Sequence, residues 1–362
     1  MDEKRILRIM SGSDKDLTAK GLRLLMQTAE PAYILATAAR NTLFNTNIRK
    51  PQPLGRPAIA VGNITTGGTG KTPFVTMLAK YLLSQNHKPA ILLRGYHSTE
   101  QGSDEARAYQ TMFKDQVIVE PNPSRIDGAK NVLRNHPQTS VFLLDDAYQH
   151  RQAARDLNLV LIDATQPFGY NHVLPRGLLR EPIKNLKRAD AIILTRADQV
   201  ENEQLQSIIN TISEAAGTPP IAHTAHQWTH LLDINDNKIQ LQDIKHKSVA
   251  AATGIGNPTA FSHTIKQHTA ALLAFDTFPD HHHFTSDDIT SLLNNTIKLG
   301  AQALLLTEKD YVKWQPLLTD NLKNIIPILR PQLSIRCITG EQDLFNLINQ
   351  TLHNTQTDQS SN

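Results

Sequence analysis

From residue 57 onward, short apolar runs alternate with helix-length stretches of mixed polarity. The chain favours helices over about 72–84 and 124–135 between these runs. Strand-length runs that are apolar on both faces and separated by helices are typical of a parallel sheet covered on both sides. The candidate strands are AIAVG (58–62), PAILLR (89–94), QVIVE from Gln116, SVFLLDD (140–146), LNLVLIDA (157–164) and DAIILTRAD (190–198). The pattern therefore predicts an α/β fold.

The pattern changes between residues 219 and 246, where polarity alternates around Asn235-Asp236-Asn237. Such alternation predicts a β-ribbon, which we expect to join two domains. A smaller α/β set follows, with SVAAATGIG, ALLAF, ALLLTEKD and LSIRCITG as strand candidates and helices from about 258, Thr285 and 341. We expect a nucleotide-binding domain over 51–222, a ribbon linker over 223–246, a smaller α/β domain over 247–353 and a disordered tail over 354–362.

The first 50 residues differ from the rest in charge. Residues 1–60 hold ten Lys/Arg against five Asp/Glu. The longest uncharged run, Pro31 to Ala39, has nine residues, fewer than the roughly 20 that span a bilayer. We expect one or two amphipathic helices in 1–50, with Pro31 at a helix start. Such a segment either docks on a membrane surface or packs on the protein body. The apolar anchors would be Tyr33, Ile34, Leu35, Leu43 and Phe44.

Composition excludes several classes of protein. The chain of 362 residues has one cysteine, Cys337, which excludes a disulfide framework and a zinc-cysteine site and favours a reducing compartment. Aromatic residues are 5% of the chain, too few to favour a nucleic-acid surface. Charged residues near the N-terminus argue against a secretory signal.

The most specific single motif is VGNITTGGTGKTP (61–73), between a predicted strand and a predicted helix. This is the context of a phosphate-binding loop, whose glycines let backbone N–H groups face the phosphates at a helix N-terminus. Lys71 would reach the β- and γ-phosphates, and Thr72 would hold Mg²⁺. Thr65 stands where the usual pattern has glycine. The nucleotide-binding residues would be Thr65, Thr66, Gly67, Gly68, Thr69, Gly70, Lys71 and Thr72.

A phosphate loop also requires an acid that holds the metal at the end of a nearby strand. Asp145 and Asp146 follow four apolar residues in VFLLDD, whereas Asp163 is a weaker candidate and reads as a strand-end cap. These residues predict a nucleoside triphosphate and Mg²⁺. Because neither TRAD (195–198) nor TEKD (307–310) matches the guanine-reading N-K-x-D, ATP is the expected nucleotide.

Several ordered segments together resemble the tetraacyldisaccharide 4′-kinases, the lipid A 4′-kinase family. They are GNITTGGTGKTP, RGYHS (94–98), GSDE (102–105), DDAYQHR (145–151) with RDLNLVLID (155–163), LPRGLLREP (174–182), GIGNP (254–258), FPDHHHFT (278–285) and LLTEKDYVK (305–313). The resemblance implies a P-loop kinase that passes the γ-phosphoryl group of ATP to the 4′-hydroxyl of a lipid A disaccharide 1-phosphate. It also implies a membrane-docking N-terminal segment, at the cytoplasmic face of the inner membrane. No obligate protein partner is evident.

The resemblance also implies roles for individual residues. Asp104, with His281 as its partner, would take the proton of the acceptor hydroxyl, although by itself Asp104 reads as a solvated loop acid. Arg180 would contact phosphate, and Glu181 would join Asp145 and Asp146 near the metal, although Arg180 and Glu181 could equally form a surface ion pair. Gln149 and His150 would line the site. Ala147, Tyr148, Arg176, Leu178 and His97 depart from the family pattern.

The run of three histidines in FPDHHHFT lies directly before a predicted helix, and this position indicates what each histidine can contact. Thr285 and Asp288 have capping-box spacing, which places the histidines in the loop before a helix. His281 would reach Asp104 from the second domain, with His282 and His283 as bystanders. Two alternatives stay open: another P-loop small-molecule kinase or ATP-dependent synthetase, and a nucleotide-dependent switch or metal-delivery protein in which the histidines bind metal.

Overall fold

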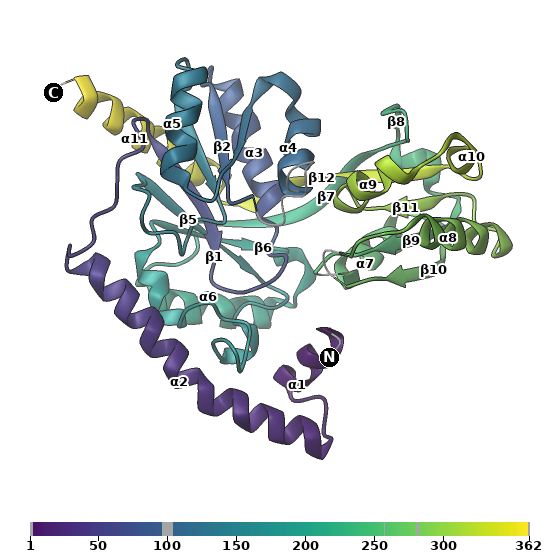
Figure 1. The fold of residues 1–362 in the computed structure, drawn as a ribbon, viewed down its shortest axis with the longest axis horizontal. Helices are drawn as coiled ribbons and strands as arrows, with labels where there is room; N and C mark the ends of the chain where they lie inside the picture. Colours follow the sequence, from purple (N-terminus) through teal and green to yellow (C-terminus); the bar gives the residue numbers. More distant parts are fainter. Residues whose placement is uncertain (1–2, 96–103, 257, 280–281, 361–362) are drawn as a thin grey trace. The chain divides into compact units, whose positions relative to one another are not determined.

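The computed structural model describes residues 3–95, 104–256, 258–279 and 282–360 (Figure 1). The chain divides into two compact units, Met1–His226 with Ile335–Asn362, and Gln227–Ser334. The predicted α/β class is confirmed, because parallel strands alternate with helices in both units.

The first unit is built on a parallel sheet in the order β7-β6-β5-β1-β4-β2-β3. β1 lies between β4 and β5 and pairs with both in parallel, so the predicted parallel sheet is confirmed. The strands are β1 (Ala58–Asn63), β2 (Pro89–Leu93), β3 (Ile118–Pro121), β4 (Val141–Asp145), β5 (Leu157–Asp163), β6 (Ala191–Thr195) and β7 (Ala222–Leu232).

Helices cover both faces of this sheet, because successive strand residues point to opposite sides. Ile59 and Val61 of β1 pack with α3 (Lys71–Ser84) and α4 (Asp104–Phe113). Ala58 and Ala60 pack in the cluster of α5 (Arg125–Asn135) on the other face. α6 (Asn202–Ala216) covers β5 and β6 through Ile208 and Ile212.

The strands of the second unit pair in parallel, in the order β10-β9-β11-β12. Its strands are β9 (Ser248–Thr253), β10 (Ala271–Thr277), β11 (Leu304–Leu306) and β12 (Ile328–Thr339), of which the residues from Ile335 onward belong to the first unit. Its helices are α7 (Pro258–His268), α8 (Ser286–Lys298), α9 (Glu308–Trp314) and α10 (Asp320–Lys323). β8 (Lys238–Ile239) pairs antiparallel with the end of β7, which forms a ribbon across residues 233–237. The 3₁₀ helices are η1 (Lys114–Gln116), η2 (Gly169–Asn171), η3 (Ile183–Arg188), η4 (Ala197–Gln199), η5 (Leu241–Ile244) and η6 (Gln315–Leu317).

The C-terminal residues of the chain belong to the first unit, whereas the sequence predicted that residues up to 353 belong to the smaller domain. Helix α11 (Glu341–Ser360) belongs to the first unit, where Leu344, Ile348 and Leu352 enter the same core as α3. Phe345 stacks on Tyr81 with ring centroids 3.8 Å apart. The helix continues through residues predicted to be a disordered tail, since no glycine or proline interrupts it.

Two helices form the N-terminal segment, α1 (Glu3–Ser11) and α2 (Leu17–Asn45). Pro31 lies inside α2, so its predicted place at a helix start is wrong. Proline removes one helical hydrogen bond there, but residues with good helix propensity surround it. No helix in the described part of the chain is long and apolar enough to cross a membrane.

Candidate active site

The phosphate loop lies between β1 and α3, as predicted, and Gly70 is the N-cap residue that precedes the helix. Gly67 and Gly70 have φ values of 113° and 86°, a region that residues with a Cβ rarely adopt. A Cβ on Gly70 would also stand 2.6 Å from Nε2 of His226. At Gly67 and Gly68 the same position is open, which leaves room for a ligand to approach the backbone.

Thr65 and Thr66 form the fixed edge of the loop. Thr65 is buried and forms a β-bridge with Leu179, and the Thr66 N–H donates to the Leu178 carbonyl at 2.7 Å. Extended backbone here suits threonine, which explains why glycine is dispensable at position 65. Thr69 is also buried, whereas Thr72 follows Lys71 at the partly exposed start of α3.

The structure brings Lys71, Asp146 and Arg180 together. The Lys71 Nζ lies 3.3 Å from Oδ1 of Asp146 and 3.4 Å from Oδ1 of Asn63. Arg180 Nη1 donates to both oxygens of Asp146 at 2.9 Å. Burial alone would raise the pKa of Asp146, but Lys71 and Arg180 outweigh burial and lower it to about 2. These three side chains together carry one net positive charge, and both cations can bind phosphate oxygens.

Asp145 has the opposite environment. Its side chain is 4% exposed, Oδ2 accepts from the Tyr109 hydroxyl at 2.9 Å, and Oδ1 has no hydrogen-bond partner among the described residues. Burial and then Glu105 raise the pKa of Asp145 to about 6. A buried carboxylate oxygen without a partner is costly, and a hard divalent cation, which prefers oxygen ligands, would satisfy it.

Gln149 and His150 also lie at this end of the sheet. Gln149 Nε2 donates to the Asn63 carbonyl at 2.9 Å. Burial, together with Arg125 and two further arginines, lowers the pKa of His150 to about 4, so its ring is neutral at pH 7. Arg125 is 2% exposed and donates to the Asp145 carbonyl at 2.8 Å. Sequence reasoning missed Arg125 and Tyr109, because no local pattern marks a buried arginine or tyrosine as part of a distant site.

Glu181 does not lie beside the phosphate loop, although the family resemblance implies a place for it near the metal. Its side chain is fully buried and accepts from Asn41, Asn185 and Arg188 at 2.7–2.8 Å and from Arg40 at 3.3 Å. The Arg180 N–H bonds the Ile64 carbonyl at 2.7 Å, so this segment is extended and its successive side chains point to opposite sides. Arg180 therefore faces Asp146 while Glu181 faces α2, and we assign Glu181 to the attachment of that helix.

We expect Glu181→Ala to lower the free energy of unfolding by about 3 kcal/mol, since it leaves buried donors without their acceptor. Urea denaturation followed by circular dichroism would measure this. The control is Glu203→Ala in the exposed first turn of α6, which should change the value by less than about 0.5 kcal/mol. Equal stability of the two variants would contradict the assignment.

The segment 172–181 contacts both α2 and the phosphate loop. On the α2 side, Glu30 accepts from the Val173 N–H at 2.9 Å and lies 3.0 Å from Nδ1 of His172, while the Tyr33 hydroxyl donates to the Arg180 carbonyl at 3.1 Å. On the loop side are the contacts of residues 178–180 with residues 64–66. One short stretch of chain therefore joins the N-terminal helix to the nucleotide loop.

The predicted general base, Asp104 with His281, lies outside the part that the structure describes. His281 is not described, and of Asp104 only the backbone is described, where it begins α4. The predicted capping box of Thr285 and Asp288 is confirmed at the start of α8. His282 precedes it and stacks on Phe278 with ring centroids 4.7 Å apart.

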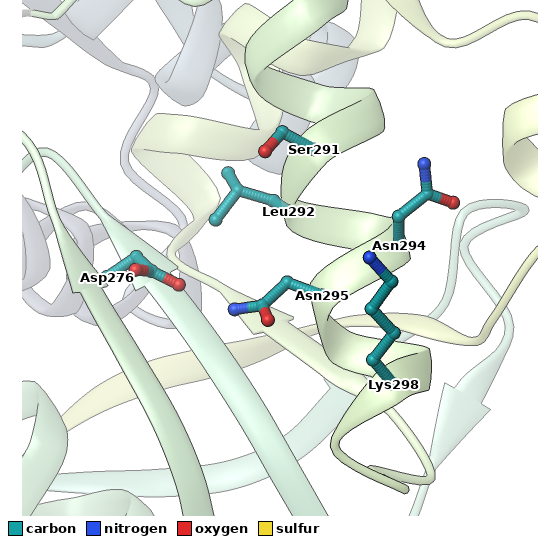
Figure 2. Close-up of a pocket in the computed structure, with 6 residues that line it drawn as sticks. All are labelled: Asp276, Ser291, Leu292, Asn294, Asn295 and Lys298. Atoms are coloured by element: carbon teal, nitrogen blue, oxygen red, sulfur yellow. The ribbon is translucent and has the colours of Figure 1, made fainter.

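A cavity of about 360 Å³ lies between β10 and α8 of the second unit (Figure 2). It is lined by Asp276, Ser291, Leu292, Asn294, Asn295 and Lys298. None of its charged side chains is buried, so it lacks the desolvated groups that distinguish the phosphate-loop site.

The parallel sheet, the glycine loop at a helix start and the two unlike aspartates define a P-loop nucleotide-binding protein. The particular family follows from comparison with known proteins. A family model described as tetraacyldisaccharide-1-P 4′-kinase matches residues 22–353. The chain belongs to this family, which is a family of kinases, as its sequence motifs indicated.

Comparison with individual relatives gives the same family. The chain is 29% identical to the tetraacyldisaccharide 4′-kinase of Halothermothrix orenii over 96% of this chain and 97% of that protein. It is 33% identical to that of Francisella tularensis subsp. novicida over 71% and 80% of the two chains. Among solved structures, LpxK from Aquifex aeolicus in complex with ATP is 26% identical, with a TM-score of 0.69 over 91% of this chain and 99% of that one.

Proposed function

We propose that this protein transfers the γ-phosphoryl group of ATP to the 4′-hydroxyl of a tetraacyldisaccharide 1-phosphate, a step of lipid A biosynthesis. The observation that carries the proposal is the Lys71–Asp146–Arg180 group beside the glycine loop, in a chain of the tetraacyldisaccharide 4′-kinase family. ATP in the related Aquifex aeolicus structure supports ATP as the donor.

The side chains divide the chemistry among them. Lys71 and Arg180 would bind phosphate oxygens and stabilise the charge that develops on the transferred group. Asp146 orients both cations. Asp104, with His281, would take the proton of the 4′-hydroxyl, a role supported by the family motifs alone. The 4′-oxygen then bonds to the γ-phosphorus as the bond to the β-phosphate oxygen breaks and ADP leaves.

We propose Mg²⁺ as the metal, held by Asp145 and Thr72. Asp145 fits this role because its Oδ1, which has no hydrogen-bond partner in the described part of the chain, is a hard oxygen ligand, and because Asp146 is already engaged by two cations. When bound, Mg²⁺ would neutralise charge on the β- and γ-phosphates.

The test is direct. Purified protein, labelled ATP and Mg²⁺ would be incubated with a lipid A disaccharide 1-phosphate in detergent, and labelled lipid would be separated from ATP. Transfer to the 4′-position supports the proposal. Transfer only to a soluble acceptor would favour another P-loop kinase, and no transfer to the lipid under any metal condition would overturn the proposal.

We also propose that α2 docks on the membrane surface, at the cytoplasmic face of the inner membrane. Leu17, Leu24 and Leu35 recur at spacings that place them on one face of α2, with Leu25 beside them, and they are 64–80% exposed. The predicted anchors Tyr33, Ile34 and Phe44 instead face the protein body. The exposed leucines would enter the lipid boundary while nearby lysines meet anionic head groups.

Replacing Leu24, Leu25 and Leu35 by serine should lower the vesicle partition coefficient about 100-fold, at about 1 kcal/mol for each leucine. Flotation with vesicles of zwitterionic and anionic phospholipid would measure it. Serines at Ile297 and Leu299, two exposed apolar residues of the second unit, provide the control and should not change binding. Unchanged binding of the triple variant would contradict docking through α2.

A further inference from the structure

Two buried residues at the end of β6, Thr195 and Arg196, hold one side of the phosphate loop. Thr195 is fully buried, and its hydroxyl donates to the Thr69 carbonyl at 2.9 Å. Arg196 is 6% exposed, and its Nη2 donates to the Gly68 carbonyl at 3.0 Å. Thr195 and Arg196 therefore contact Thr69 and Gly68 in the glycine-rich part of the loop, whereas Leu178 and Leu179 contact Thr66 and Thr65 before it.

Peptide geometry gives these contacts a consequence for the ligand. In a trans peptide the carbonyl of one residue and the N–H of the next point in opposite directions. Holding the Thr69 carbonyl against Thr195 therefore turns the Gly70 N–H toward the other side of the loop. That is the side on which backbone N–H groups of such loops meet phosphate oxygens.

Arg196 is itself held firmly. Its Nη1 donates to Oδ2 of Asp163, whose other oxygen accepts from the Thr165 hydroxyl at 2.7 Å. Asp163 and Thr195 are paired residues of neighbouring strands, so the sheet register fixes this arrangement. Arg196 has φ 53°, an uncommon conformation for a residue with a side chain. Its charge is thus balanced by Asp163, and the guanidinium is directed at the loop carbonyl.

His226 of β7 lies on the same side of the loop. It packs against Gly70, and burial followed by Arg196 lowers the pKa of His226 to about 3. A neutral ring therefore fills the space behind Gly70 without a second positive charge beside Arg196. The glycine-rich part of the loop is supported here by a hydroxyl, a balanced guanidinium and the packed ring of His226, whose Nε2 has no hydrogen-bond partner among the described residues.

We infer that Thr195 and Arg196, the latter oriented by Asp163, are positioning residues of the phosphate loop. They act on ATP through the loop backbone, Thr195 by fixing the direction of the Gly70 N–H and Arg196 by holding the Gly68 carbonyl, and they set the affinity for the β- and γ-phosphates. This inference rests on the proposed binding of ATP to the loop.

Thr195→Val tests the inference, since valine keeps the shape of threonine and removes the hydroxyl. The matched control is Thr224→Val, at an equally buried threonine of β7 whose hydroxyl donates to the Leu194 carbonyl at 3.2 Å. Calorimetry would give the Kd of ATP and of AMP for each variant. We expect Thr195→Val to weaken ATP binding about tenfold, the effect of one hydrogen bond, with AMP binding unchanged and the control like wild type.

Arg196→Lys provides a second measurement. Lysine keeps a positive charge near Asp163 but lacks the planar fork that reaches two acceptors. We expect a raised KM for ATP, an unchanged KM for the lipid acceptor and faster amide hydrogen exchange in residues 67–70. ATP affinities equal to wild type in both variants would overturn the inference. Wild-type protein that does not bind ATP would overturn the proposed function and the inference with it.

Discussion

Replacing Lys71 by methionine should lower the rate of phosphoryl transfer by about three orders of magnitude and leave the protein folded. Methionine is of similar length and removes the one charge of the loop, which in the proposed mechanism binds the β- and γ-phosphates. Asp146 keeps its two 2.9 Å contacts with Arg180 in the variant, so no buried charge is left without a partner. Single-turnover kinetics with labelled ATP would measure the rate, and thermal unfolding would verify the fold.

A control lies on the same helix. Lys80 is exposed near the end of α3, and Lys80→Met should keep the wild-type rate. If Lys71→Met retained more than a tenth of the wild-type rate, Lys71 would have no direct role in transfer.

Asp145→Asn should lower the rate by about 100-fold or more and raise the Mg²⁺ concentration needed for half-maximal activity. Asparagine can still accept the Tyr109 hydroxyl through its amide oxygen, so the variant removes charge rather than shape. Asp146→Asn should differ: it releases Lys71 and Arg180 and lowers the rate without the same shift in Mg²⁺ dependence. Initial rates over a Mg²⁺ titration would separate the two aspartates.

Asp127→Asn, in the exposed first turn of α5, is the control for loss of a carboxylate and should match wild type. A Mg²⁺ titration of Asp145→Asn that superimposes on that of wild type would remove Asp145 from the proposed metal site.

Much of the fold could be predicted because its signals are local. A buried strand, a glycine loop and a helix start follow one another within 58–84, and each is visible in the adjacent residues. The same holds for Asp145 and Asp146, which directly follow a buried strand. Their different environments were not predictable, because Tyr109 and Arg180 come from distant parts of the chain.

The errors and omissions have physical causes. The family resemblance implies a place near the metal for Glu181 beside Arg180, but an extended segment turns adjacent side chains to opposite sides. Thr195 and Arg196 were set aside as a poor match to a base-reading motif. Their contact with the loop depends on the strand order β6-β5-β1, which the sequence does not reveal.

The attachment of segment 172–181 to both α2 and the phosphate loop has a consequence for inhibition. A small molecule that binds between α2 and segment 172–181 would break contacts of Glu30, Tyr33 or Asn41. It would thereby displace this segment, which also positions Arg180 and Thr66. Such a compound would slow phosphate transfer without competing with ATP. Screens that detect only displacement of nucleotide would overlook it.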